Sequence, residues 1–283
     1  MLLVFVFNYL PMGGIIIAFK NYRYDKGIFG SEWVGFDNFK FFVESNEFFK
    51  LTRNTLMLNA LFISVGIIAA LAVAILLFCL KGRLNTKIYQ TMMITPNFVS
   101  WVVASYMVYA FLSPQNGIIN GLLIKLGMNK VDWYNTPAAW PAILTVAGVW
   151  KHVGMDCIIY YAALMGIDST LFEAADVDGA SSWVKIKCII IPTLVPLLTI
   201  LTILKIGGIF RSDFGMFYQL TRDVGALYDV TDVIDTYTYR VMRVIGNMGM
   251  GSAIGLLQSV VGVVLVLTTN YVSKKIDSEL GLF

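Results

Sequence analysis

Six long apolar segments alternate with polar segments along the chain. They cover about residues 1–19, 56–80, 88–112, 138–165, 189–210 and 251–272. The hydrocarbon core of a bilayer is about 30 Å thick, so a helix that crosses it needs about 20 largely apolar residues. The pattern predicts an all-α, polytopic membrane protein with six transmembrane helices in one transmembrane domain over 1–283. The first segment carries no charge and starts abruptly, so we expect a clipped transmembrane helix there.

The composition agrees with this prediction. Hydrophobic residues make up 58% of the chain and charged residues only 14%, whereas an ordinary soluble domain has roughly 25% charged residues. The 21 basic and 18 acidic residues leave a net charge of +3 without a basic cluster, which argues against nucleic acid as a partner. Three cysteines lie far apart in or beside apolar runs, so we interpret them as packed or membrane-buried thiols.

The distribution of Lys and Arg predicts the orientation. The short connection 81–87 contains Lys81, Arg83 and Lys87, and two further lysines follow the last span, so both segments are expected on the cytoplasmic side. Alternation of the spans then places 166–188 inside and the long loops 20–53, 113–137 and 211–250 outside. The outer loops are rich in aromatic residues, which favours contact with membrane lipid at the interface.

The inner connection 166–191 carries a structured pattern. Residues 171–175 favour a helix, Gly179 favours a tight turn, and Ser181 or Ser182 can cap a second helix before Pro192 disfavours its continuation. The pattern predicts a helix-turn-helix on the membrane surface. Such a unit, apolar on one face, suits docking into a groove of a partner protein.

This loop resembles the signature of permease subunits of binding-protein-dependent ABC importers. The chain reads Glu173-Ala174-Ala175, then Gly179 after three residues, and Ile189-x-Ile191-Pro192 after nine more, against the family pattern EAA-x3-G-x9-I-x-L-P. Asp178 and Ala180 extend the match towards the carbohydrate-uptake branch. The stretches 7–23, 33–42 and 53–62 resemble the first-type, maltose-like permeases of oligosaccharide and polysaccharide-derived glycan importers.

The resemblance implies a set of partners. The loop would bind a cytoplasmic ATPase, with Glu173 as a polar anchor, Ala174 and Ala175 permitting close approach, and Gly179 making the turn. A second, different permease, two ATPase subunits and an extracellular or periplasmic solute-binding protein would complete the importer. The chain has no G-x-x-x-x-G-K-[ST] motif, so ATP and Mg²⁺ would be bound by the ATPase and no cofactor by this chain. The expected location is the cell membrane.

Ionisable residues inside spans are costly and tend to mark a transport pathway. The fourth span contains Lys151, His152, Met155 and Asp156, and the resemblance places this stretch among the sugar contacts of maltose-type permeases. His152 and Asp156 share a helical face and can pair. A purely structural ion-pair network of Lys151 and His152 with Asp156 is the alternative interpretation.

The fifth span supplies the other pathway candidates. Lys205, Gly208 and Ser212 share a face, with Arg211 and Asp213 at the outer end, where snorkelling towards the interface also explains the two charges. If Lys151, Lys205 and Arg211 face the pathway, an acidic oligosaccharide is favoured over a neutral one.

Other functions are less consistent with the sequence. An ion-coupled secondary transporter could use Lys151 and Asp156 for coupling, but the signature loop and the lack of evident inverted repeats argue against it. A structural membrane protein would not need polar residues in the middle of its spans. A metal site or an enzyme centre is disfavoured because His152 is the only histidine and no nucleophile-base arrangement is evident.

Overall fold

The computed structural model describes residues 2–80 and 82–276, and it is almost entirely helical. Met1 and Lys81, which the sequence analysis places at the start of the first span and in the first inner loop, lie outside the described residues. Four helical segments are long and apolar enough to cross a membrane: Glu47–Cys79, Pro137–Leu164, Ser182–Gly207 and Met248–Lys275. Two shorter apolar helices, Phe5–Phe19 and Trp101–Leu112, fall on the other two predicted spans.

The first predicted span consists of α1 (Leu2–Val4), η1 (Phe5–Tyr9) and η2 (Leu10–Phe19), and η2 packs against the last helix, α15 (Met248–Ile276). The end of the molecule predicted to face outwards is called the outer end below, and the end with the loop 166–188 is called the inner end. The segment after the first span lies at the outer end and contains a small antiparallel pair, β1 (Lys20–Asn21) and β2 (Glu32–Trp33), around α2 (Gly27–Gly30), and then α3 (Asp37–Val43). The next helix, α4 (Glu47–Cys79), starts well before residue 56, so its first turns belong to the predicted outer loop.

The third predicted span, 88–112, is broken rather than continuous. It consists of α5 (Arg83–Ile94), η3 (Thr95–Phe98) and α6 (Trp101–Leu112). Pro96 supplies no backbone N–H, and Val99 and Ser100 adopt extended conformations with ψ of 126° and 151°. Ser100 then caps α6 by accepting a hydrogen bond from the Val103 amide. The sequence pattern predicted one continuous helix over 88–112 and missed this break.

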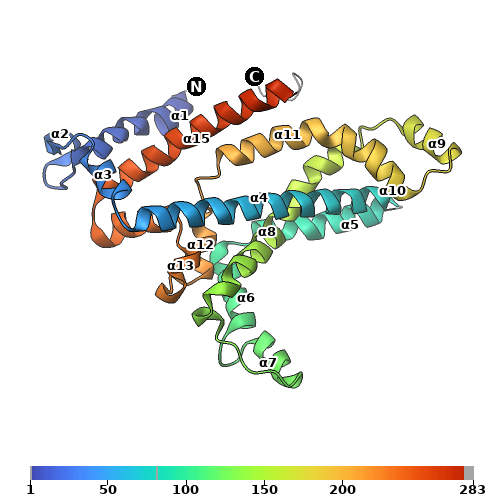
Figure 1. Ribbon diagram of the computed structural model, residues 1–283, viewed down its shortest axis with the longest axis horizontal. Helices are drawn as coiled ribbons and strands as arrows, with labels where there is room; N and C mark the ends of the chain where they lie inside the picture. Colours follow the sequence, from blue (N-terminus) through green and yellow to red (C-terminus); the bar gives the residue numbers. More distant parts are fainter. Residues whose placement is uncertain (1, 81, 277–283) are drawn as a thin grey trace.

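The remaining elements complete the outer and inner ends of the molecule. Outside the long helices the structure contains α7 (Ile118–Lys125), η4 (Trp133–Asn135), η5 (Pro137–Ala139), α12 (Phe214–Leu220), η7 (Gly225–Leu227), α13 (Tyr228–Thr231), α14 (Ile234–Arg240) and η8 (Val241–Ile245). Between α8 (Trp140–Leu164) and α11 (Ile191–Gly207) lie α9 (Ser169–Val177), α10 (Ser182–Lys185) and η6 (Ile186–Ile190). Figure 1 shows α9 and α10 at the end of the molecule opposite α2 and α3.

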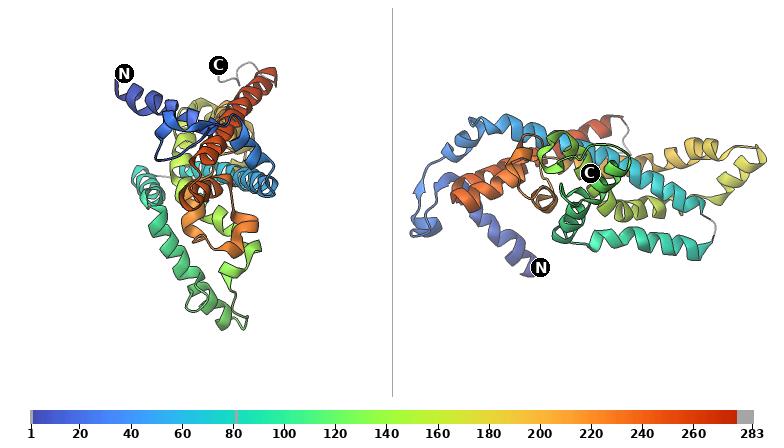
Figure 2. Two further views of the ribbon diagram at one scale, coloured as in Figure 1. Left: turned by 90° about the vertical axis from the view of Figure 1, so that its left-hand side faces the viewer. Right: turned by 90° about the horizontal axis from the view of Figure 1, so that it is seen from below.

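The pairing of α4 with α8 forms the centre of the fold. Towards the inner end, Ala70 and Ala74 are fully buried and allow close approach beside Tyr160. Gly154 lies so close to the α5–η3 segment that an added Cβ would meet the Met93 carbonyl oxygen at 1.8 Å. Figure 1 and the left view of Figure 2 show α6 and α7 leading away from this bundle. The core therefore holds α8 and the broken third span in a fixed relation.

Candidate functional site

A cavity of about 320 Å³ lies between α4, α8 and α11, next to the start of α12. Its walls combine apolar side chains with several charged groups deep in the bundle. The lining residues are Asn59, Phe62, Ile63, Gly66, Thr145, Gly148, Val149, His152, Val153, Asp156, Lys205, Gly208, Ile209, Arg211, Asp213 and Met216. Five of the eight residues expected on the substrate pathway are therefore brought together here: His152, Asp156, Lys205, Gly208 and Arg211.

An ion pair links the two helices on either side of the cavity. Lys205 Nζ on α11 donates a hydrogen bond to Asp156 Oδ2 on α8 at 2.7 Å. The two side chains are 34% and 29% exposed, so they remain accessible from the cavity. The expected pairing of His152 with Asp156 is wrong in the structure, because Lys205 reaches across from the neighbouring helix and takes the carboxylate.

His152 faces a different carboxylate. Its Nε2 lies 3.9 Å from Asp213 Oδ2, and the same oxygen accepts a hydrogen bond from the Trp101 indole at 2.6 Å. The other oxygen of Asp213 caps α12 by accepting from the Met216 amide. Asp213 thus fixes Trp101 at the start of α6 relative to His152 on α8.

Lys151 lies outside the cavity. It is 6% exposed, and its Nζ donates to the carbonyl oxygens of Asn97, at 2.9 Å, and Val99. The ammonium also lies 5.2 Å from the centre of the Trp101 ring. Successive side chains on an α-helix point in directions about 100° apart around its axis. Lys151 therefore points to the break between α5 and α6, while His152 faces the cavity. The alternative interpretation, an ion-pair network of Lys151 and His152 with Asp156, is therefore wrong.

Met155 and Ser212 also do not line the cavity. Met155 is 46% exposed on the outside of α8. Ser212 belongs to an unwound segment after α11, where its amide donates to Asp235 Oδ2 and its hydroxyl accepts from Asn59. The structure thus gives Ser212 a role in holding the chain.

The unwound segment 208–213 is stabilised by polar side chains that sequence reasoning missed. Asn59 on α4 donates to the Ile209 carbonyl at 2.8 Å, and Gln258 on α15 donates to the Phe210 carbonyl at 2.7 Å. An interrupted helix in an apolar environment needs such partners for its free carbonyls. An amide side chain within a largely apolar span was the available signal for both residues.

Arg211 is the exposed cation of this region. Its Nη2 donates to Ser259 Oγ at 2.9 Å, and it borders the cavity as well as two grooves beside α15. Among the described residues, the ion pairs within 4.0 Å do not include Arg211. Lys205, by contrast, is neutralised by Asp156.

The loop between α8 and α11 forms the predicted helix-turn-helix. The Asp168 carboxylate accepts from the Thr170 amide at the start of α9, and this hydrogen bond lowers the pKa of Asp168 below 3.8. At the other end of α9, Gly179 has φ +71°. The Gly179 amide donates to the backbone carbonyl of Asp176, and the Ala180 amide donates to the backbone carbonyl of Ala175. This is a Schellman turn, which ends α9 where Gly179 permits it.

The surface of this loop is open. Glu173, Ala174 and Asp178 are exposed, Ala175 and Ala180 are half-buried, and apolar Val177 is 89% exposed. Phe172 anchors the loop to the bundle by packing on Phe78 of α4, with ring centres 5.6 Å apart. The loop therefore presents the signature residues outwards at the inner end of α8 and α11.

Pro192 does not end the second helix, contrary to the expectation from sequence. Ser181 caps α10, the backbone widens into the π-helical turn η6, and Ile191–Gly207 continues as α11. Proline has no backbone N–H to donate, and its ring clashes with the preceding turn of a regular α-helix. The wider π-helical turn η6 leaves room for the ring of Pro192. The loop is thus joined directly to the helix that carries Lys205.

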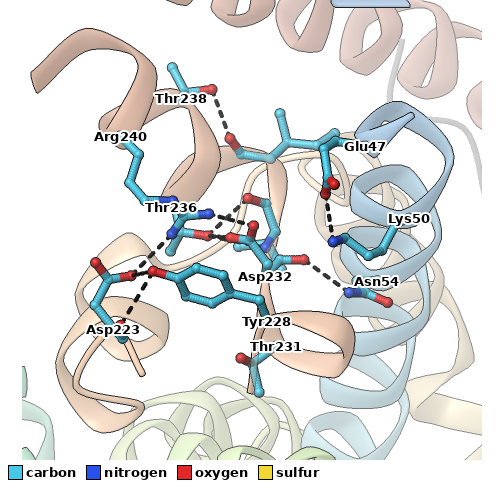
Figure 3. Close-up of polar contacts among 12 residues, drawn as sticks. Glu47, Lys50, Asn54, Asp223, Tyr228, Thr231, Asp232, Thr236, Thr238 and Arg240 are labelled. Atoms are coloured by element: carbon cyan, nitrogen blue, oxygen red, sulfur yellow. Dashed lines mark hydrogen bonds and ion pairs between the residues drawn. The ribbon is translucent and has the colours of Figure 1, made fainter. Parts of the chain in front are cut away.

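A second polar cluster, which the sequence analysis did not single out, lies at the outer end (Figure 3). Asp223 Oδ1 accepts from the Tyr228 hydroxyl at 2.8 Å and from Arg240 Nη1 at 3.0 Å, and Arg240 also pairs with Asp232. Burial, followed by the hydrogen bond to Asp223, raises the pKa of Tyr228 to about 12. This cluster holds the segments between α12 and α14 together.

The long apolar helices, the charged cavity within the bundle and the exposed inner loop define a multi-pass membrane transport protein. The family model for the inner membrane component of binding-protein-dependent transport systems matches residues 63–278. The chain belongs to this family, and the resemblance read from the signature loop is confirmed. It is a transport permease and not an enzyme.

Two curated relatives match nearly the whole chain. Protein LplB of Bacillus subtilis (strain 168) is 35% identical over 278 residues, covering 98% of this chain and 86% of the relative. The polygalacturonan/rhamnogalacturonan transport system permease protein YteP of the same organism is 32% identical over 274 residues, covering 97% and 85%.

A solved structure has the same fold. It is a chain of a bacterial ABC transporter involved in the import of the acidic polysaccharide alginate, with a TM-score of 0.88, 32% identity and coverage of 98% of this chain and 92% of the other. A second structure, the alginate transporter in complex with an alginate pentasaccharide-bound periplasmic protein, gives a TM-score of 0.87 at 32% identity.

Proposed function

We propose that this chain is a permease subunit of an ATP-driven importer that carries oligosaccharides across the cytoplasmic membrane. One observation supports the proposal above all: α8 and α11 carry the cavity side chains Asp156 and Lys205, and the same two helices flank the exposed signature loop. A force applied to the loop therefore acts on both walls of the cavity. The names of the relatives support a sugar as the transported molecule.

The mechanism follows from this arrangement. A loaded solute-binding protein docks at the outer end, where the cluster of Asp223 and Arg240 keeps the surface in one conformation. A cytoplasmic ATPase receives the loop through Glu173 and the close-fitting Ala174 and Ala175. When the ATPase closes and opens, it moves α8 and α11 together. The cavity then opens alternately to one side of the membrane and to the other.

The complete importer contains four further subunits in this proposal. A second, different permease closes the pathway, two ATPase subunits bind ATP and Mg²⁺, and a solute-binding protein delivers the sugar. The exposed surface of the loop, including Val177 and Trp183 at 89% and 71% exposed, is consistent with burial against the ATPase.

We further propose that the transported oligosaccharide is acidic. Lys151 lies outside the cavity and Lys205 is paired, so this part of the proposal rests on Arg211, whose side-chain hydrogen bond within the described part of the chain is to the neutral Ser259 hydroxyl. A guanidinium binds a carboxylate through two parallel hydrogen bonds, which a neutral sugar cannot reproduce.

The test is ATP hydrolysis by the complex co-purified with its ATPase subunits and reconstituted in lipid. Sugar-loaded binding protein should stimulate turnover, and Glu173→Ala should reduce the stimulation about tenfold, the value of one charge-assisted hydrogen bond. Glu44→Ala, an exposed glutamate at the opposite end, is the matched control. Equal stimulation in both variants would contradict the coupling role. Stimulation by neutral but not by uronate-bearing oligosaccharides would overturn the acidic substrate.

A further inference from the structure

The helices α6 and α12 pack together and enclose a second hollow beyond the central cavity. The central cavity touches the first turn of α12 through Asp213 and Met216. About two turns further on, a hollow of about 230 Å³ opens between the same two helices. Its lining residues are Val102, Ser105, Tyr106, Tyr218, Gln219, Arg222 and Asp223.

The lining of this hollow suits a carbohydrate. Tyr106 is 67% exposed, so one ring offers an open face, while Tyr218 is held by stacking on Phe214 with ring centres 5.1 Å apart. The polar side chain of Gln219 also lines the hollow, as does Ser105, whose largely buried hydroxyl donates to the Val102 carbonyl and can still accept a hydrogen bond. Aromatic faces that cover the apolar side of a ring, together with a few polar groups that fix its orientation, are the usual composition of a small-molecule site.

Arg222 supplies a cation at the end of the hollow. Its guanidinium lies 4.4 Å from the centre of the Tyr109 ring, and the ion pairs of the described residues do not include it. Arg222 and Asp223 both have positive φ, 56° and 51°, a conformation that costs free energy for residues other than glycine. Asp223 is held there by Tyr228 and Arg240, and the turn leaves Arg222 exposed.

A third hollow, of about 380 Å³, is also lined by Arg222. Its other polar lining residues are Gln115, which precedes α7, and Asp132 and Asn135, which flank Trp133 and Tyr134 of η4. The two hollows therefore meet at one guanidinium, which can reach a ligand in either of them.

We propose that the α6–α12 hollow is a second sugar subsite, which binds a unit of an acidic oligosaccharide outside the central cavity and contacts its carboxylate through Arg222. This inference rests on the proposed function. It implies that the permease distinguishes chain length: an oligosaccharide long enough to occupy both positions gains contacts that a disaccharide lacks.

The test uses the reconstituted complex with its binding protein and saturated oligogalacturonates of two to five units. The measured quantity is the concentration of loaded binding protein that gives half-maximal ATP turnover. Arg222→Gln and Tyr106→Ala should raise this concentration about tenfold for five units and less than twofold for two units. Arg243→Gln and Tyr271→Phe, which change exposed side chains elsewhere, are matched controls. Size-exclusion elution of the assembled complex checks folding.

The other possible results of this experiment would overturn the subsite or the proposed function. An equal increase for two and five units would overturn the subsite and indicate that Arg222 binds the docked protein itself. No change for any length would also overturn it. If no oligogalacturonate stimulates the wild-type complex, the same series is measured with cello-oligosaccharides. Stimulation by these neutral sugars would overturn the carboxylate contact while leaving the import function intact, and stimulation by neither series would overturn the proposed function.

Discussion

At the residue scale, charged side chains inside the bundle divide into two kinds. Asp156 and Lys205 pair with each other at 2.7 Å and remain accessible from the cavity, whereas Lys151 is buried against two backbone carbonyls. The sequence pointed to all three as pathway residues, because an ionisable group within a span is the visible signal. Which neighbour each would meet depends on helix rotation and on long-range packing, and neither can be read from the local pattern.

Removing one partner of the pair should destabilise the assembled complex. Lys205→Met leaves the Asp156 carboxylate unpaired, and because the pair is partly exposed we expect a loss of about 1–2 kcal/mol rather than the larger value of a fully buried pair. Asp156→Leu should have a similar effect. Thermal unfolding of the complex measures both, and the double variant should recover most of the loss. Additive losses in the double variant would show that the two side chains do not interact.

Lys151 and His152 should respond differently to substitution. Lys151→Met leaves the carbonyls of Asn97 and Val99 without their donor, which should cost about 1–3 kcal/mol of stability. It should not change the oligosaccharide concentration dependence of ATP turnover, because Lys151 does not line the cavity. His152→Gln should leave thermal stability nearly unchanged but alter that dependence. The reverse result would place Lys151 on the pathway after all.

At the element scale, the signature loop was the part most fully predicted from the sequence. The helix start, the turn at Gly179 and the capping serine all have local causes, and the structure has all three. The continuation of the helix through Pro192 was missed, because a π-helical turn depends on packing rather than on local preference. The break at Val99 and Ser100 was missed for a related reason: Lys151, more than 50 residues away, supplies its hydrogen bonds.

Gly179 should tolerate asparagine better than alanine. Its φ of +71° costs a residue with a side chain about 1–2 kcal/mol, and asparagine adopts this conformation most readily among them. No atom lies within 4 Å of an added Cβ, so the backbone and not a clash determines the outcome. We expect Gly179→Ala to lower binding-protein-stimulated ATP turnover more than Gly179→Asn. Equal effects would show that the left-handed turn is not needed for coupling.

The outer cluster predicts a dependence on alkaline pH. The pKa of Tyr228 is raised from 10.0 to about 12, first by burial and then by its hydrogen bond to Asp223. A group whose pKa is raised by folding stabilises the protein fully below the unfolded value, and the contribution is lost as pH rises towards the folded value. The difference in unfolding temperature between wild type and Tyr228→Phe should therefore be constant below pH 10 and shrink between pH 10 and 12. A difference that stays constant above pH 10 would contradict the assignment.

At the scale of the whole molecule, length and composition were enough to predict a polytopic, all-helical membrane protein. They could not predict the cavity, because its residues come from four helices, α4, α8, α11 and α12, and from the unwound segment 208–213. Asn59 and Gln258 illustrate the limit: each is visible as a polar residue in an apolar run, but only the fold brings them to one segment of backbone.

The arrangement of the helices also supports the proposal that the loop and the cavity move as one unit. The α8 helix runs from the cavity to the loop, and α11 returns from the loop to Lys205, so the inner and outer parts share two rigid elements (Figure 1). Coupling through such elements needs no separate pathway of side chains.

The most direct test of this account is oligosaccharide uptake into proteoliposomes that contain the complete complex, with the ATP-binding sites facing ATP and all ion gradients collapsed by ionophores. We predict that uptake continues at its full rate, requires ATP and loaded binding protein, and falls about tenfold in Glu173→Ala. Uptake that disappears with the ion gradient and proceeds without ATP would contradict the account and indicate an ion-coupled transporter that uses the pair of Lys205 and Asp156.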